Sequence, residues 1–348
     1  MPTACRPLDA ASMPAWDAFV DAMPTGTFFH RGAWAEVFTR AFGHTSHYIM
    51  AERDGSVVGI LPMVHVKTRL FGNSLISNPF CVYGGPLAVD ADAAACLLAE
   101  ADRIMQRTGA TLTEFRFLHP MPDGWLDEAW QERSGLYVTF RKPITGSDDA
   151  NLKAIPRKQR AMVRKGIDRG LTSSTDQDVD GLHRIYAESV RNLGTPVFSR
   201  RYFRILAEAF GDRMDVVTVQ DAGVPVAAVM NFYDRGEVLP YYGGGIAAAR
   251  GNYANDFMYW EVMRRAAARG CTLFDFGRSK VGTGAFSFKK NWGFTPQSLV
   301  HRYHLQPGAS IPDLNPLNPK YRLFIAAWKR LPLPVANLIG PHVVRGIG

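Results

Sequence analysis

Residues 274–294 hold the side chains of this sequence that are most able to do chemistry. The carboxylate of Asp275 lies on a predicted strand, two residues before Gly277, and could accept a proton from an attacking ammonium group. Arg278 and Lys280 follow on a glycine-rich loop, which suits the close approach of a phosphate or carboxylate. The structural alternatives are a carboxylate that ties down a neighbouring loop and cations that are simply solvated.

Further side chains could complete such a site. Lys289 and Lys290 follow on a predicted helix, where the alternative is one buried stem and one surface charge. The pair Tyr241 and Tyr242 points to opposite faces of a strand, so Tyr242 could donate to an oxyanion, or could simply pack. Asn231 could do similar work from the neighbouring strand.

The elements that must position these residues occur twice along the chain. Each half contains a hairpin, a Tyr-Gly-Gly string, a long helix and a closing strand, at offsets of 159 and 161 residues. Asp275 thereby corresponds to Glu114. We expect two tandem α/β domains of one fold, consistent with a length of 348 residues. The expected elements are hairpins at 48–67 and 215–234, helices at 91–108 and 255–269, and strands at 111–118 and 271–277. The expected domains are 1–150 and 176–305, with a basic inter-domain helix at 151–175 and a C-terminal tail at 306–348.

The net charge of +8 is concentrated in two segments. Residues 153–170 hold seven basic residues and one acid, and residues 320–348 hold five basic residues and no acid. The first segment predicts a helix that presents Arg157, Arg160 and Arg164 on one face, for contact with an anion or with solvent. The second mixes cations with aromatic and aliphatic groups, and either packs back on the domains or contacts the inner membrane. Lys67 and Arg69 could clamp a pyrophosphate from the first domain, or be surface charges.

Composition narrows the class of protein. With 47% hydrophobic and 21% charged residues, the chain is typical of a globular protein. We find no signal peptide and no apolar run long enough to span a membrane, so we expect a cytoplasmic protein, at most peripheral at the inner membrane. The four cysteines and nine histidines show no ligand spacing, so we expect reduced thiols and no metal site.

Five strings that span nearly the whole chain are similar to the FemAB family, whose members add amino acids from aminoacyl-tRNA to peptidoglycan precursors. The similarity is closest to FemAB-like proteins of exosortase/PEP-CTERM systems. It implies two tandem GNAT folds, transfer of an acyl group to an amine, and an acceptor held by the first domain. It also places Lys289, within a Phe-Lys-x-x-aromatic-Gly element at 288–293, where it handles a reacting carbonyl. The strings are at 29–34, 42–44, 67–85, 274–294 and 318–334.

The resulting expectation is a FemAB-like acyl or aminoacyl transferase acting on an amine of a cell-envelope glycan, peptidoglycan or exopolysaccharide precursor. We expect no tightly bound cofactor, an anionic or lipid-linked glycan substrate, a donor that is aminoacyl-tRNA or acyl-CoA, and no stable protein partner. Residues 249–255 lack the second glycine of a CoA-binding loop, which weighs against CoA. The alternatives are an acyl-CoA-dependent N-acyltransferase and a non-catalytic protein that binds glycan or RNA.

Overall fold

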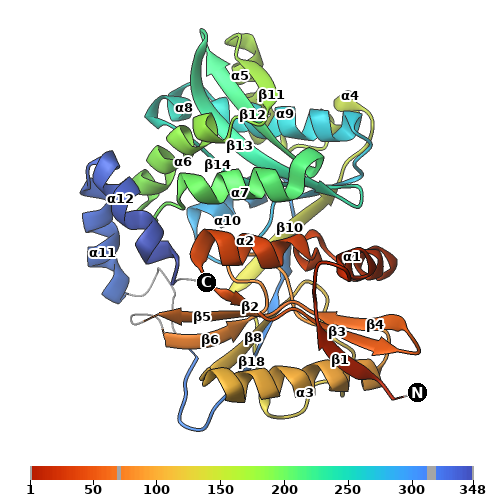
Figure 1. Cartoon of the computed structure of the whole chain (residues 1–348). Helices are drawn as coiled ribbons and strands as arrows, with labels where there is room; N and C mark the ends of the chain where they lie inside the picture. Colours follow the sequence, from red (N-terminus) through yellow and green to blue (C-terminus); the bar gives the residue numbers. More distant parts are fainter. Residues whose placement is uncertain (1, 69–71, 312–318, 347–348) are drawn as a thin grey trace. The chain divides into compact units, whose positions relative to one another are not determined.

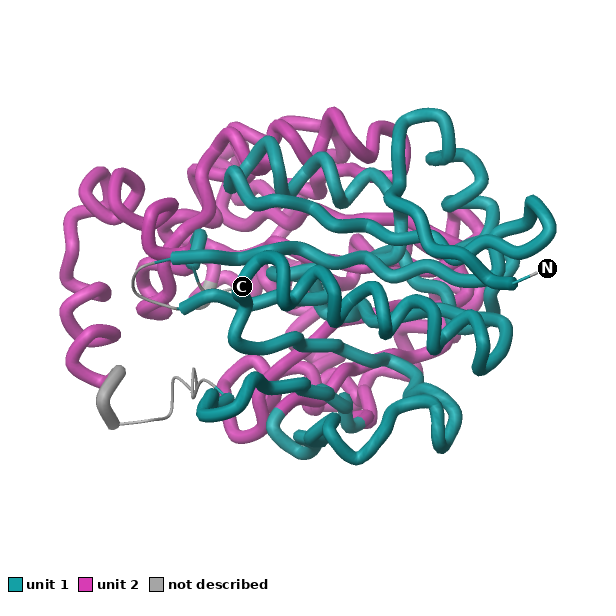
Figure 2. The backbone as a smooth tube through the Cα atoms, turned by 60° about the horizontal axis from the view of Figure 1, so that its bottom comes forward, with its two compact units in different colours: residues 1–136, 298–314, 345–348 teal, residues 137–297, 315–344 magenta. Residues whose placement is uncertain are grey.

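The computed structural model describes residues 2–68, 72–311 and 319–346. The chain forms two compact units, which Figure 2 colours separately. The first comprises Met1–Leu136, Ser298–Leu314 and Arg345–Gly348, and the second comprises Tyr137–Gln297 and Asn315–Val344. The units change at 136/137 and 297/298, and not at the ends of the expected domains 1–150 and 176–305. The reason is that each unit includes a strand from the other half of the chain, as described below.

The second unit is a mixed sheet with helices on both faces (Figure 1). Helices α6 (Val179–Leu193) and α7 (Arg200–Phe210) cover one face, and α9 (Ala254–Ala268) with α5 (Arg157–Asp168) covers the other. The remaining short elements are α4 (Asp148–Lys153), η2 (Gly211–Arg213), α8 (Ala247–Gly251) and α10 (Gly284–Asn291). In spatial order the strands are β11 (Thr172–Asp176), β12 (Met214–Asp221), β13 (Val224–Asp234), β14 (Glu237–Gly245), β15 (Leu273–Asp275), β10 (Tyr137–Pro143) and β16 (Ser279–Lys280), and β17 (Pro296–Ser298) also pairs with β10.

Sequence pattern accounts for these elements. The predicted hairpin at 215–234 is confirmed as β12 and β13, joined at Ala222 and Gly223, which both have the positive φ that tight hairpins require. Alternation along β13 sends Ala227 and Val229 into the core under α9. The predicted helix at 255–269 is confirmed within one residue as α9.

Strands β14 and β15 part soon after they meet. They pair in parallel only where Glu237 and Val238 face Leu273 and Phe274. From there β15 runs antiparallel to β10, with Asp275 opposite Arg141. The end of β15 and the loop after it therefore belong to the β10 side of the sheet.

The first unit contains two sheets. The predicted helix at 91–108 is confirmed as α3 (Ala91–Thr108). It begins where the Asp90 carboxylate accepts a hydrogen bond from the Ala93 amide, and it ends at Gly109, which has a φ of 65°. One sheet orders β1 (Ala4–Pro7), β3 (Ile49–Arg53), β4 (Ser56–Leu61) and β7 (Leu87–Ala88). The other orders β2 (Thr45–Ser46), β5 (Val64–Thr68), β6 (Gly72–Ile76), β8 (Leu112–Phe117), β18 (Val300–Leu305) and β9 (Trp130–Arg133). The other helices are α1 (Met13–Ala22), η1 (Phe28–His30) and α2 (Ala33–Phe42).

The repeat is visible in the closing strands. β8 runs parallel to β6 and antiparallel to β18, as β15 runs parallel to β14 and antiparallel to β10. Each unit thus receives one strand from the opposite half of the chain: β18 in the first unit and β10 in the second. The Tyr-Gly-Gly strings do not correspond structurally, because 83–85 lies in a loop whereas 242–244 lies in β14.

The C-terminal segment forms α11 (Pro319–Arg330) and α12 (Leu333–Val344), which both pack on α6. Trp328 is 2% exposed, and Gly340 lies against Val197. Of the two interpretations of this tail, the structure shows packing on the second unit. Within the described residues, no helix combines the length and the apolar character that crossing a bilayer requires.

Candidate active site

Lys289, in the last turn of α10, lies over the loop that follows β15. Its Nζ donates hydrogen bonds of 3.0 Å to the carbonyl oxygens of Gly277 and Arg278. The half-buried side chain passes the rings of Phe140 and Phe276, whose centroids lie 5.8 and 5.9 Å from Nζ. Two of the three ammonium hydrogens therefore have acceptors among the described residues, and the third can serve a substrate.

Burial among these rings lowers the pKa of the Lys289 amine to about 7. Nearby Asp275 opposes this shift by favouring the ammonium form, and Arg278 adds to it. Near neutral pH the amine thus exchanges readily between its charged and neutral forms, a property that is typical of groups in active sites.

This shift predicts the pH at which Lys289 reacts with acetic anhydride in a competitive labelling experiment. Only the neutral amine is nucleophilic, so labelling of Lys289 should rise with a midpoint at about pH 7, measured by mass spectrometry of its peptide. The other lysine peptides of the digest are the internal reference. A midpoint at the ordinary value of 10.5 would contradict the assignment.

Asp275 is a buried residue that holds the same loop. Its Oδ1 accepts from the Gly277 amide at 2.7 Å and from the Thr139 hydroxyl at 3.4 Å. Its Oδ2 lies 3.3 Å from Nε of Arg141, which also pairs with Glu237. These contacts favour the alternative of a carboxylate that ties down a loop and so positions the carbonyls that bind Lys289.

Arg278 and Lys280 lie beside a residue that the sequence interpretation missed. The Arg278 guanidinium carbon and the Lys280 Nζ lie 4.5 and 5.1 Å from the ring centroid of Tyr137. Both cations are partly exposed, so an anionic substrate group can reach them.

Four residues of β10 lie at the candidate site but could not be predicted from the sequence, all for the same reason. They lie in the range assigned to the first domain, and nothing in their spacing links them to residues 274–294. These residues are Tyr137, Thr139, Phe140 and Arg141.

Tyr242 and Asn231 belong to other clusters of the second unit. The Tyr242 hydroxyl lies 2.7 Å from that of Tyr202, among rings of α6 and α7. Asn231 is fully buried and donates to the Asp215 carboxylate at 2.8 Å. The structure therefore brings together Lys289, Asp275, Arg278 and Lys280, and places Tyr242 and Asn231 in packing and buried hydrogen-bonding roles.

The basic helix α5 lies beside the element that carries Lys289. A side chain at Gly293, just after α10, would collide with Pro156, which precedes α5. Asp256 of α9 further joins the two, because it accepts from the Gln159 amide and from the Trp292 indole. No cation of α5 has a carboxylate partner among the described residues, and Lys165 lies over the ring of Tyr253. The other four, here called the α5 cations, are Arg157, Lys158, Arg160 and Arg164.

In the first unit, Lys67 is exposed on β5, and Arg69 lies outside the described residues.

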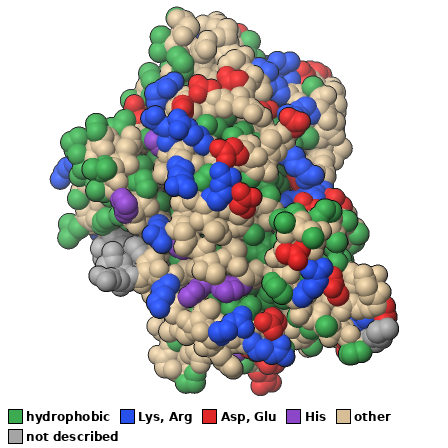
Figure 3. Space-filling model, viewed as in Figure 1, with side chains coloured by type: hydrophobic (Ala, Val, Ile, Leu, Met, Phe, Trp, Pro, Cys, Tyr) green, Lys and Arg blue, Asp and Glu red, His purple; other side chains and the backbone are tan. Residues whose placement is uncertain are grey.

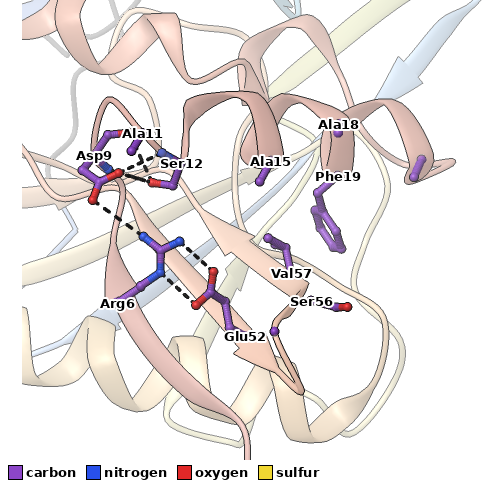
Figure 4. A pocket seen from close by; sticks show the side chains of 12 residues that line it. Arg6, Asp9, Ala11, Ser12, Ala15, Ala18, Phe19, Glu52, Ser56 and Val57 are labelled. Carbon is purple, nitrogen blue, oxygen red and sulfur yellow. Dashed lines mark hydrogen bonds and ion pairs between the residues drawn. The ribbon is translucent and has the colours of Figure 1, made fainter.

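A cavity of about 700 Å³ lies between α1 and the β3–β4 hairpin (Figure 4). Its single guanidinium, Arg6, is held by Glu52 at 2.7 and 2.8 Å, and alanines of α1 form much of its wall. None of the predicted site residues lines this cavity. Among the described residues no cluster of His, Cys, Asp and Glu could hold a metal ion.

Backbone amides at the starts of α8 and α9 are hydrogen-bonded to side chains of the protein. The Ala247 amide donates to the Glu188 carboxylate at 3.3 Å, and the Ala254 amide donates to the Asn252 side chain at 3.3 Å. Both amides therefore already have acceptors within the chain.

Known proteins resemble this chain in one domain model and in several solved structures. Residues 153–290 match the family model described as an acetyltransferase (GNAT) domain. The solved structure of FemX is 17% identical with a TM-score of 0.69, covering 92% of this chain and 99% of that chain. L-PGS from Bacillus licheniformis is 13% identical with a TM-score of 0.55, covering 95% and 96%. A tandem GNAT protein from the clavulanic acid biosynthesis pathway is 12% identical with a TM-score of 0.54, covering 88% and 100%. No curated protein sequence matches the chain.

These likenesses confirm the expected fold, a mixed α/β chain with tandem GNAT relatives. Residues 153–290 form an acyltransferase domain of the GNAT type, and they include Asp275, Arg278, Lys280 and Lys289. The likeness to FemX agrees, at the level of the fold, with the resemblance to the FemAB family.

Proposed function

We propose that this protein transfers an acyl or aminoacyl group to an amine of a cell-envelope glycan, peptidoglycan or exopolysaccharide precursor at the cytoplasmic face of the membrane. The observation that carries the proposal is Lys289, an amine with a pKa of about 7 held on two carbonyls within a GNAT-type acyltransferase domain. The resemblance to FemAB-like proteins of exosortase systems supports the class of acceptor.

The chemistry follows from the position of this amine. When the acceptor amine attacks the donor carbonyl, negative charge develops on the carbonyl oxygen. The third N–H of the Lys289 ammonium donates to that oxygen and stabilises the tetrahedral intermediate. The intermediate then collapses, the donor's leaving group departs, and the new amide nitrogen loses its proton to solvent. Arg278 and Lys280 bind an anionic end of a substrate, and Asp275 is a positioning residue because it fixes the loop that holds Lys289.

We propose aminoacyl-tRNA as the donor. The α5 cations form an unpaired positive surface beside α10, as a polyanion requires. The Glu188 carboxylate at the Ala247 amide disfavours acyl-CoA. In this proposal Lys67 and Arg69 serve the acceptor from the first unit.

The α5 cations provide a specific prediction. Arg157→Gln/Arg164→Gln should weaken binding of an aminoacyl-tRNA about tenfold and reduce the slope of log affinity on log salt by about 1.5, because two phosphate contacts are lost. Fluorescence anisotropy at several salt concentrations measures both quantities.

Lys153→Gln/Arg169→Gln is the matched control for that prediction. It removes the same charge from the same segment, but Lys153 and Arg169 are already paired with Asp149 and Asp221. Equal effects of the two double variants would show that general charge, and not the α5 cations, binds the RNA.

Mass spectrometry of envelope polysaccharide and of lipid-linked precursors, from wild-type and deletion cells, tests the function. A mass difference equal to one acyl or aminoacyl group, restored by the wild-type gene, is the expected result. Identical masses would overturn the proposal. Micromolar binding of acetyl-CoA in calorimetry would overturn the choice of donor.

A further inference from the structure

Helices α11 and α12 are each held on the second unit by one side. Trp328 and Ala336 are 2% and 1% exposed, and Ile325 lies against Gly194 at the end of α6. The Arg191 side chain donates to backbone carbonyls of Lys329 and Leu331. The two helices are thus fixed on the folded unit, and their other sides are presented in a defined arrangement. Because Trp328 is buried, it belongs to the side of α11 that packs on the unit and is not part of the outer side.

The free side of both helices is apolar. Leu323 is 83% exposed and lies nearly opposite Ile325 on α11, and Leu338 is 71% exposed and lies nearly opposite Ala336 on α12. Figure 3 shows the resulting hydrophobic side chains over these helices, at the left of the view. Half of the ten large exposed hydrophobic residues described in the chain lie here, and they are Leu323, Phe324, Val335, Leu338 and Ile339. Such a cluster marks an interaction surface.

The charge around this apolar surface has one sign. Arg322, Lys329 and Arg330 are exposed on α11 and have no carboxylate partner among the described residues. Residues 319–348 contain no aspartate or glutamate at all. Apolar side chains flanked by uncompensated cations match the boundary between the acyl chains and the headgroups of an anionic bilayer.

We propose that α11 and α12 form a membrane-docking surface that binds peripherally to anionic lipid. A second copy of the chain is a poor occupant, because pairing this surface with itself would bring its cations together. Each helix has 12 residues, so the pair lies on the bilayer and does not cross it. The proposal is independent of the identity of the acyl donor.

Sedimentation of the full-length protein with vesicles tests this surface. About a third of the lipid is phosphatidylglycerol in one set of vesicles, and all of it is phosphatidylcholine in the other. We expect binding to the anionic vesicles to be at least about tenfold tighter. Leu323→Glu/Leu338→Glu should lower that binding about tenfold, because it places carboxylates in the contact.

Val224→Glu is the control variant, since Val224 is 59% exposed at the tip of the β12–β13 hairpin, and its binding should equal that of the wild type. Unchanged melting temperatures show that each variant is folded. The proposal is overturned if the double variant binds as tightly as the wild type, or if neither vesicle binds the protein. It is also overturned if the wild type is a dimer that the double variant abolishes, because a second copy would then cover this surface.

Discussion

Lys289→Met is expected to lower product formation about 10²–10³-fold while the protein stays folded, because it removes a donor to the developing oxyanion. That loss corresponds to about 3–4 kcal/mol of transition-state stabilisation. Methionine keeps the apolar stem against Phe140 and Phe276, and it removes an amine whose burial disfavours its charged form. The measurement is the mass of the modified envelope product in deletion cells that express the variant.

Lys290→Met provides the comparison for this prediction, because Lys290 is the next residue of α10 and is exposed. It should leave product formation within about twofold of the wild type, as surface substitutions away from a site usually do. Melting temperatures of both purified variants separate a lost function from a lost fold. Full product with Lys289→Met would remove this lysine from the active site.

Arg116→Leu is expected to lower the free energy of unfolding of the first unit by about 3–5 kcal/mol. Arg116 is 3% exposed and donates to Oε1 of Glu114 at 2.8 Å, where Nδ1 of His301 also lies within 3.1 Å. Without Arg116, the buried carboxylate of Glu114 keeps only His301 of these two partners, so its negative charge is less well stabilised. Calorimetry or denaturant unfolding measures the effect.

Arg103→Leu is the control in the same unit, since its pair with Glu100 is on the surface of α3, where solvent screening leaves an ion pair little effect on stability. The pH dependence gives an independent check. Burial alone would raise the pKa of Glu114, but Arg116 and His301 outweigh burial and lower the pKa. The ion cluster therefore stabilises the wild type above the ordinary glutamate pKa of about 4.3, and this stability is lost as the pH falls below it. A variant as stable as the control would refute the prediction.

The sequence identified the elements whose signals are local. A glycine with positive φ follows both α3 and α9, and both hairpins turn at a pair of residues with positive φ, so neighbouring residues indicate where these elements end. The exchange of β10 and β18 could not be predicted in this way. Its strand partners lie far apart in the chain, so no local pattern records which sheet each strand joins.

The same distinction between local and distant residues applies to the candidate site. Arg278, Lys280 and Lys289 lie within one short segment, and the structure brings them together. Two interpretations of Tyr242, an oxyanion donor and a packed ring, stayed open, because alternation shows only that it opposes Tyr241 and not which layer of helices it meets. Tyr137 was missed because it reaches the site from the other half of the chain.

The exchanged strands also govern how this protein can be made. Of the two sheets of the first unit, the one that contains β8 is complete only when β18, about 180 residues further along the chain, has been synthesised. During synthesis, the edge of β8 that pairs with β18 therefore stays unpaired until almost the whole chain has left the ribosome. An unpaired strand edge is prone to aggregation. A gene cut between the repeats would yield two fragments that each lack a strand and carry the other's, and the fragments should be recovered as a soluble pair only when they are co-expressed.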